Sequence, residues 1–126
     1  MATSVKEMMD AANAAVPRLT PDEVRAMAGK ADVLLLDVRD PSEVQASGKI
    51  KGAVNVSRGL LEFRADPTSP ARHPGLSQDK TVVLYCGSGG RAALGGKTLK
   101  ELGYRSVFNG GGFKDLADAG LDTEPA

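Results

Sequence analysis

Two apolar runs along the chain lack the polar alternation of a half-exposed strand. They read DVLLLDVR at 32–39 and TVVLY at 81–85. Continuous Val and Leu residues are typical of strands that a parallel sheet buries on both faces. Two shorter segments, at 53–57 and 106–109, predict further strands.

Helix signals fall before, between and after these runs. The first helix is predicted from Ser4, with Glu7 at the capping-box position. The second begins at Thr20, with Pro21 at its first helical position. The predicted helices span residues 4–16, 21–29, 91–103 and 112–120. Strands that alternate with helices indicate an α/β fold with a largely parallel sheet.

Two features interrupt this pattern. Gly95 and Gly96 lie inside the third predicted helix, where each costs about 1 kcal/mol relative to alanine, so close packing against another element is expected there. The segment 58–80 carries three prolines and three arginines between two strands. We expect a helical turn at 59–64 followed by an irregular excursion. Connections of this length are either lids over an active site or surface insertions.

Length and charge narrow the class of protein. A chain of 126 residues suits one compact domain, which we expect at 17–126 after an N-terminal helical extension at 1–16.

Sixteen basic and sixteen acidic residues cancel, so neither nucleic acid nor a membrane is an expected partner. The N-terminus lacks the basic start and apolar stretch of a secretory signal, which predicts a cytoplasmic protein. With a single cysteine and a single histidine, His73, no metal site is expected.

The only cysteine, Cys86, stands at the end of the second apolar run. Gly87, Gly89 and Gly90 follow it, and glycine backbones can adopt positive φ angles that turn N–H groups inward around a sulfur or a bound anion. A helix that begins near Arg91 adds the partial positive charge of its N-terminus. Both effects favour the thiolate, which is the nucleophilic form. The other role open to a lone cysteine at a strand end is burial as a small hydrophobic side chain.

Four motifs stand in order along the chain. They read LLLDVRDPSEV at 34–44, GKIKGAVNV at 48–56, CGSGGRA at 86–92 and NGGGFKDLADAGL at 109–121. Together they resemble the signatures of the rhodanese family, sulfurtransferases that carry a sulfane sulfur as a cysteine persulfide. The resemblance implies a rhodanese-like three-layer α/β sandwich with a central, mostly parallel sheet of about five strands flanked by helices. It also implies a first short strand near Arg18 and Leu19.

The chain departs from the family pattern at several positions. Lys49 and Lys51 stand where the family often has His and Pro, and Leu116 replaces a frequent Trp. These positions are structural. Many thiosulfate-using members carry a cationic side chain where this chain has Gly87, so fewer charges meet a dianionic donor. This departure counts against efficient turnover of thiosulfate.

The number of residues in the cysteine loop indicates whether the loop binds a sulfur atom or a phosphate group. Protein phosphatases of the same fold resemble rhodaneses but have a Cys-x5-Arg loop, one residue longer. Here Cys86 and Arg91 enclose four residues. The shorter loop forms a smaller nest of inward-facing N–H groups. This nest suits a single sulfur atom, since each amide must lie about 2.9 Å from the atom that it binds. A phosphatase-like enzyme stays open as an alternative.

The resemblance implies a reaction and a set of residues for it. The Cys86 thiolate takes a sulfane sulfur from thiosulfate or a persulfide donor, holds it as a persulfide and passes it to a thiol or protein acceptor, with no cofactor. The predicted substrate-binding residues are Gly87, Ser88, Gly89, Gly90, Arg91 and Arg58. Arg91 either orients the anionic donor or pairs with an acidic neighbour. The second alternative for the whole protein is an interaction module that keeps the fold and receives no sulfur.

Three charged residues follow the first apolar run. The strand is predicted to end near these residues, Asp37, Arg39 and Glu43, so they could lie at the same edge of the sheet as the cysteine loop. We favour an ion-pair network that holds the loops together and assign none of the three a catalytic role.

Overall fold

A parallel sheet forms the centre of the protein. Within residues 2–126, the part of the chain that the computed structural model describes, the sheet has four strands. They are β1 (Val33–Asp37), β3 (Val54–Asn55), β4 (Thr81–Cys86) and β5 (Ser106–Gly112), in the order β3-β1-β4-β5. All pairs are parallel, so the carboxyl ends of the strands meet at one edge, where open α/β sheets bind ligands. The four strands predicted from the sequence are confirmed.

The fifth strand, expected near Arg18 and Leu19, is reduced to a single parallel bridge between Arg18 and Asn109. The N–H of Leu19 donates to the carbonyl of Asn109, and the N–H of Asn109 donates to the carbonyl of Pro17, both at 2.9 Å. Pro17 has no N–H to extend the ladder, and a helix begins at Pro21. Pairing therefore stops after one residue.

The helices begin at the signals that the sequence carries. They are α1 (Val5–Ala15), α2 (Pro21–Met27), α3 (Pro41–Ser47), α4 (Leu61–Ala65), α5 (Gly90–Glu101) and α6 (Phe113–Asp118), with a 3₁₀ turn, η1, at Arg58–Leu60. Complete capping boxes start α1 at Ser4 and α2 at Thr20, as predicted. The sequence interpretation missed α3, although Asp40 and Glu43 form the same box at its start.

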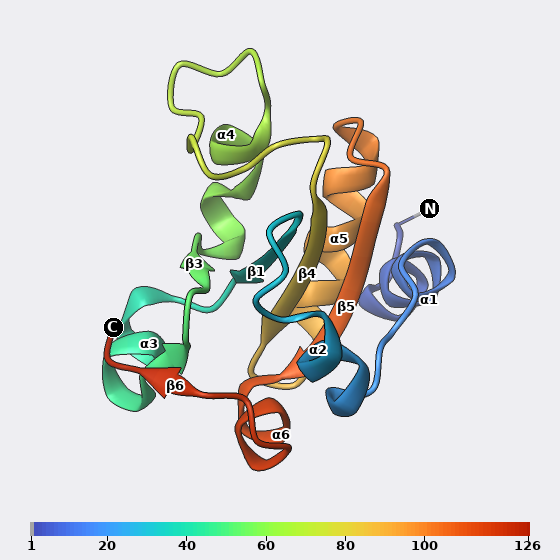
Figure 1. Ribbon diagram of the computed structural model, residues 1–126. Coiled ribbons are helices and arrows are strands. Elements are labelled where there is room, and N and C mark those ends of the chain that lie inside the picture. The colour runs from blue at the N-terminus through green and yellow to red at the C-terminus, as the bar shows by residue number, and fades with distance from the viewer. Residues whose placement is uncertain (1) are drawn as a thin grey trace.

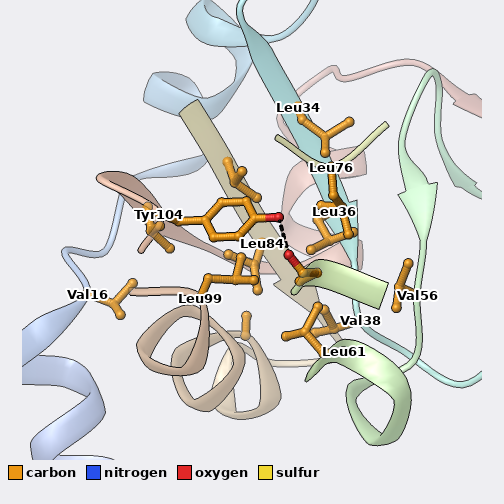
Figure 2. Close-up of a cluster of buried hydrophobic side chains, with 14 of the residues drawn as sticks. Val16, Leu34, Leu36, Val38, Val56, Leu61, Leu76, Leu84, Leu99 and Tyr104 are labelled. Carbon is orange, nitrogen blue, oxygen red and sulfur yellow. Dashed lines mark hydrogen bonds between the residues drawn. The ribbon is translucent and has the colours of Figure 1, made fainter. Parts of the chain in front are cut away.

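Alternate side chains of the strands fill two hydrophobic cores, one on each face of the sheet. The core on the α5 face includes Leu34, Leu36, Val82, Leu84, Leu99 and Tyr104 (Figure 2). The core beneath α2 and α6 includes Val24, Leu35, Val83, Tyr85 and Leu116. Because side chains alternate along a strand, the even-numbered positions of β4 face α5 and the odd-numbered ones face away. The expected three-layer sandwich results, with α1 and α5 on one side of the sheet and α2 and α6 on the other (Figure 1).

Helix α1 packs against α5, and both internal glycines of α5 lie in close contacts. A Cβ on Gly96 would lie 3.0 Å from two methyl carbons of Val16, which is buried in the α5-side core. A Cβ on Gly95 would lie 3.1 Å from methyl carbons of Leu61 and Leu84. The close packing expected at these glycines is therefore present, and side chains rather than another backbone provide it.

The excursion after α4 lies at the end of the sheet opposite to Cys86 (Figure 1). Gln78 Nε2 donates to the carbonyl of Leu102, just past the C-terminus of α5, at 2.7 Å. The hydroxyl of Tyr104 donates to the carbonyl of Ala65 at 2.9 Å (Figure 2). A six-residue strand is about 20 Å long, so β4 separates this segment from the cysteine loop. The excursion is a surface insertion, and its interpretation as a lid is wrong.

A small second sheet joins the C-terminus to the turn before β3. Strands β2 (Lys49–Ile50) and β6 (Thr123–Glu124) pair antiparallel, which the sequence did not predict. Lys49, at a position where the resemblance implied a histidine, forms an ion pair with Glu124. In the described part of the chain, no helix has the length and apolar character needed to cross a membrane.

Candidate active site

Cys86 ends β4 with its side chain on the α5 face of the sheet. It continues the even-numbered positions that face this core, and 1% of the residue is exposed. The N–H of Gly89 donates to the Cys86 sulfur at 3.0 Å. Among the described residues, this is the one amide within hydrogen-bonding distance of the sulfur. One amide therefore contacts the sulfur, at the N-terminus of α5, and the nest of several amides around it stays a prediction.

The three loop glycines serve different purposes. Gly89 has φ +106°, in the region that side chains avoid, and this conformation turns the chain back over the sulfur and into α5. At Gly87 a Cβ would lie 3.2 Å from Arg91 Nη2 and 4.0 Å from Glu43 Oε2. Nothing lies within 4 Å of a Cβ on Gly90. The requirement for positive φ that was expected of all three holds at Gly89 alone.

Asn109 holds the loop from the side of β5. Its Nδ2 donates to the carbonyl of Gly89 at 3.0 Å, and its Oδ1 accepts from the N–H of Gly111 at 2.9 Å. The side chain is buried, so both bonds are made away from water. The sequence interpretation missed this role. A polar residue directly before three glycines, in an otherwise apolar strand, is the signal that could have found it.

Arg18 lies against the same loop. Its Nη1 would be 2.6 Å from a Cβ on Gly89, and its Nη2 would be 3.1 Å from a Cβ on Gly111. Nη2 also lies 3.5 Å from the carbonyl oxygen of Ser88. A cation thus stands beside the loop at a position that the sequence interpretation had assigned only to a short strand.

Arg91, at the end of the loop, pairs with Glu43 of α3. Its Nη1 donates to Glu43 Oε1 at 2.6 Å and its Nη2 donates to Oε2 at 3.0 Å. Chiefly through these bonds, Arg91 lowers the pKa of Glu43 to about 2, and Glu43 raises the pKa of Arg91. Of the two roles open to Arg91, pairing with an acidic neighbour is the one that the structure contains.

The other two charged residues after β1 form a buried ion pair. Three contacts of 2.7–3.1 Å join the guanidinium of Arg39 to the carboxylate of Asp37, and both side chains are 4% exposed or less. Arg39 also donates to Ser47 Oγ and to the carbonyl of Gly48, both at 2.8 Å, and lies 4.3 Å from the ring centre of Phe113. The expected ion-pair network is present as two separate pairs: the Asp37–Arg39 pair holds the end of α3 near β1, and the Glu43–Arg91 pair joins α3 to α5.

The structure does not bring Arg58 to the loop. Its guanidinium donates to Glu62 Oε1 at 3.0 Å and to Thr98 Oγ1 at 3.1 Å. Thr98 stands eight residues beyond Gly90 in α5, which is about 12 Å along the helix axis. The prediction that Arg58 binds the donor therefore lacks support from its position. Ser88 is exposed at the loop, as a substrate-binding residue requires.

One hollow in the described structure lies away from the cysteine loop. It has a volume of about 390 Å³ and is lined by residues of α2, β2 and the turn after α6, including Arg25, Lys51 and Asp122. The cysteine loop instead opens directly to solvent at Gly87 and Ser88. In residues 2–126, no three side chains of the metal-binding types gather into a site.

Comparisons with known proteins agree with this geometry. A family model described as a rhodanese-like domain matches residues 20–119. A sulfurtransferase of Allochromatium vinosum is 35% identical over 83 residues, which cover 66% of this chain and 69% of that protein. A polysulfide-sulfur transferase homodimer of Wolinella succinogenes has a TM-score of 0.72 at 35% identity, with 96% of this chain and 87% of that one covered. A Rhodopseudomonas palustris protein of unknown function, described as a possible tyrosine phosphatase, has a TM-score of 0.90 at 39% identity, with 98% and 96% covered.

Proposed function

We propose, from the premise that this chain belongs to the rhodanese-like domain family, that it is a sulfurtransferase whose Cys86 carries the sulfur as a persulfide. The relative from Allochromatium vinosum supports sulfur transfer as the general activity. The observation that carries the proposal for Cys86 is the bond from the Gly89 N–H to its sulfur, at the N-terminus of α5. An amide and a helix N-terminus that face a sulfur stabilise negative charge on it.

The reaction has two steps that balance without a cofactor. In the first, the thiolate of Cys86 attacks the sulfane sulfur of the donor. A sulfur–sulfur bond forms at Cys86, and the bond between the transferred sulfur and the rest of the donor breaks. With thiosulfate as the donor, sulfite leaves with the electron pair of the broken bond. In the second step, a nucleophilic acceptor attacks the outer sulfur and the Cys86 thiolate leaves. The amides of Gly87, Ser88, Gly89 and Gly90 are proposed to stabilise the persulfide between the steps.

The donor is proposed to be a small sulfur-containing anion, thiosulfate or a persulfide. The polysulfide-sulfur transferase of Wolinella succinogenes supports the persulfide class. The acceptor is proposed to be a thiol or a protein, encountered in the cytoplasm, with no part for nucleic acid or a membrane. Arg91 lies beside the loop, where its pairing with Glu43 neutralises its positive charge.

A phosphatase is the second candidate, because the similar protein from Rhodopseudomonas palustris is described as a possible one. Two observations weigh against it here. The loop has four residues between Cys86 and Arg91, and both terminal nitrogens of Arg91 are bonded to Glu43 rather than free for a phosphate. The sulfurtransferase remains the better supported function.

One experiment separates the candidates. The protein is incubated with thiosulfate or with polysulfide, and its intact mass is measured before and after treatment with cyanide. We expect a gain of one sulfur atom, which cyanide removes as thiocyanate, and no gain in a Cys86→Ser variant. A Cys86→Ser variant that still gained and transferred sulfur would contradict the mechanism.

The remaining outcomes support the alternatives. If thiosulfate, mercaptopyruvate and polysulfide all fail to load the wild-type protein, an interaction module that receives no sulfur becomes the better interpretation. Hydrolysis of an aryl phosphate that the Cys86→Ser variant loses would instead establish the phosphatase.

A further inference from the structure

Glu43 places a carboxylate beside the entrance to the cysteine loop. Its Oε2 would lie 4.0 Å from a Cβ on Gly87, the residue that follows Cys86 and is exposed. The side chain is fixed there by three bonds: two from Arg91, and one from the N–H of Asp40 to Oε1 at 3.1 Å. The Arg91 guanidinium lies closer still, with its Nη2 3.2 Å from the same Cβ position, so a donor that approaches the sulfur past Gly87 meets an arginine whose positive charge Glu43 neutralises.

This carboxylate cancels the charge of the arginine at the end of the loop. Arg91 and Glu43 form one pair, and the buried pair of Asp37 and Arg39 forms a second, so neither presents net charge to a ligand. Arg18 contributes a cation against Gly89 and Gly111 and is not within 4 Å of a Cβ at position 87. The charged atoms within 4 Å of that Cβ thus belong to one ion pair, Arg91 and Glu43.

We infer that Glu43 determines the donor specificity of the site, by disfavouring dianionic donors such as thiosulfate relative to donors with one negative charge. The inference rests on the proposed sulfurtransferase function. The penalty for a dianion is twice that for a monoanion, because the Coulomb energy scales with the charge of the ligand. Glu43 can act on the donor in this way because Gly87 has no side chain to cover the carboxylate.

Two donors of matched chemistry test the inference. Thiosulfate carries two negative charges, whereas methanethiosulfonate has a methyl group in place of one oxygen and carries one. In both, the Cys86 thiolate attacks the terminal sulfur, which leaves sulfite or methanesulfinate with the electron pair of the broken sulfur–sulfur bond. The second-order rate constant of persulfide formation is measured for each donor by intact mass, with the Cys86→Ser variant as background.

We expect Glu43→Gln to raise the rate constant for thiosulfate roughly threefold to tenfold, and that for methanethiosulfonate less, so that the ratio between the donors shifts about twofold to threefold. High salt should shrink this shift, because ions screen charges at the surface. Glu43→Asp keeps the charge and should keep the wild-type ratio. Glu101→Gln removes a carboxylate that pairs with Lys97 at the far end of α5, and should also leave the ratio unchanged.

The outcomes distinguish this inference from the proposed function. An unchanged ratio in Glu43→Gln, in a protein that loads sulfur and unfolds at the wild-type temperature, overturns the role of Glu43 alone. Equal acceleration with both donors also overturns it, because a change in the loop that is independent of donor charge would explain that result. A wild-type protein that gains sulfur from neither donor overturns this inference, and one that also gains none from mercaptopyruvate or polysulfide overturns the sulfurtransferase function.

Discussion

Gly112 of β5 lies so close to Gly87 that no side chain fits between them. A Cβ on Gly112 would stand 2.6 Å from the carbonyl oxygen of Gly87. The backbone at Gly112 has φ −107° and ψ 146°, which alanine adopts without strain. A methyl group at this position therefore tests space alone. Since Gly87 follows Cys86 directly, this contact sets the height of the loop above the sulfur.

We predict that Gly112→Ala slows persulfide formation by about tenfold or more, because it displaces the loop backbone from the reacting sulfur. Overpacking should also lower the free energy of unfolding by about 1–3 kcal/mol. Gly59→Ala is the matched control, since nothing lies within 4 Å of a Cβ at that position. Intact mass and urea unfolding measure the two effects. Equal behaviour of the two variants would contradict the prediction.

Asn109→Ala should slow persulfide formation and destabilise the fold together. The substitution leaves the N–H of Gly111 without its partner and removes one of two bonds to the carbonyl of Gly89, which still accepts from the N–H of Ala93. A buried polar group that loses its partner costs about 1–3 kcal/mol. Urea unfolding and the rate of sulfur loading measure the two effects. Normal loading in a destabilised variant would show that Asn109 supports the fold but does not position the loop.

Asp37→Asn should lower the free energy of unfolding by about 3–5 kcal/mol, because it leaves the buried guanidinium of Arg39 without its counter-charge. The matched control is Asp118→Asn, which breaks an exposed pair with Lys114 and should cost about 1 kcal/mol or less. Denaturant unfolding of the two variants measures the difference. Similar losses in both would mean that the Asp37–Arg39 pair contributes no more than a surface pair.

The Glu43–Arg91 pair should persist to low pH. Folding lowers the pKa of Glu43 from 4.5 to about 2, so the pair contributes its full stability above pH 4.5 and loses it as the pH falls towards 2. Both side chains are more than a third exposed, so solvent screening limits this contribution to about 1 kcal/mol or less. Carbon-13 NMR of the Glu43 carboxyl group measures the midpoint, which Arg91→Gln should move back towards 4.5. A wild-type midpoint near 4.5 would contradict the pairing.

Much of the fold could be predicted because its signals are local. Continuous Val and Leu runs identified β1 and β4, and Ser4 and Thr20 marked the starts of α1 and α2. The missed α3 shows how such signals can be overlooked, since its capping residues are as clear as those of α2. The two-residue strands β2 and β6 are too short to leave a pattern of their own.

The sequence by itself determined that a lone cysteine ends a buried strand and that glycines and a helix N-terminus follow it. Tertiary structure alone decided what surrounds that loop. Arg91 pairs with a residue 48 positions away, and Arg18 reaches the carbonyl of Ser88 across 70 positions. Arg58, predicted at the donor, is bonded to Thr98 instead. The physical reason is that capping and side-chain alternation depend on neighbours in sequence, whereas the partners of a long charged side chain depend on which loops the packed sheet brings together.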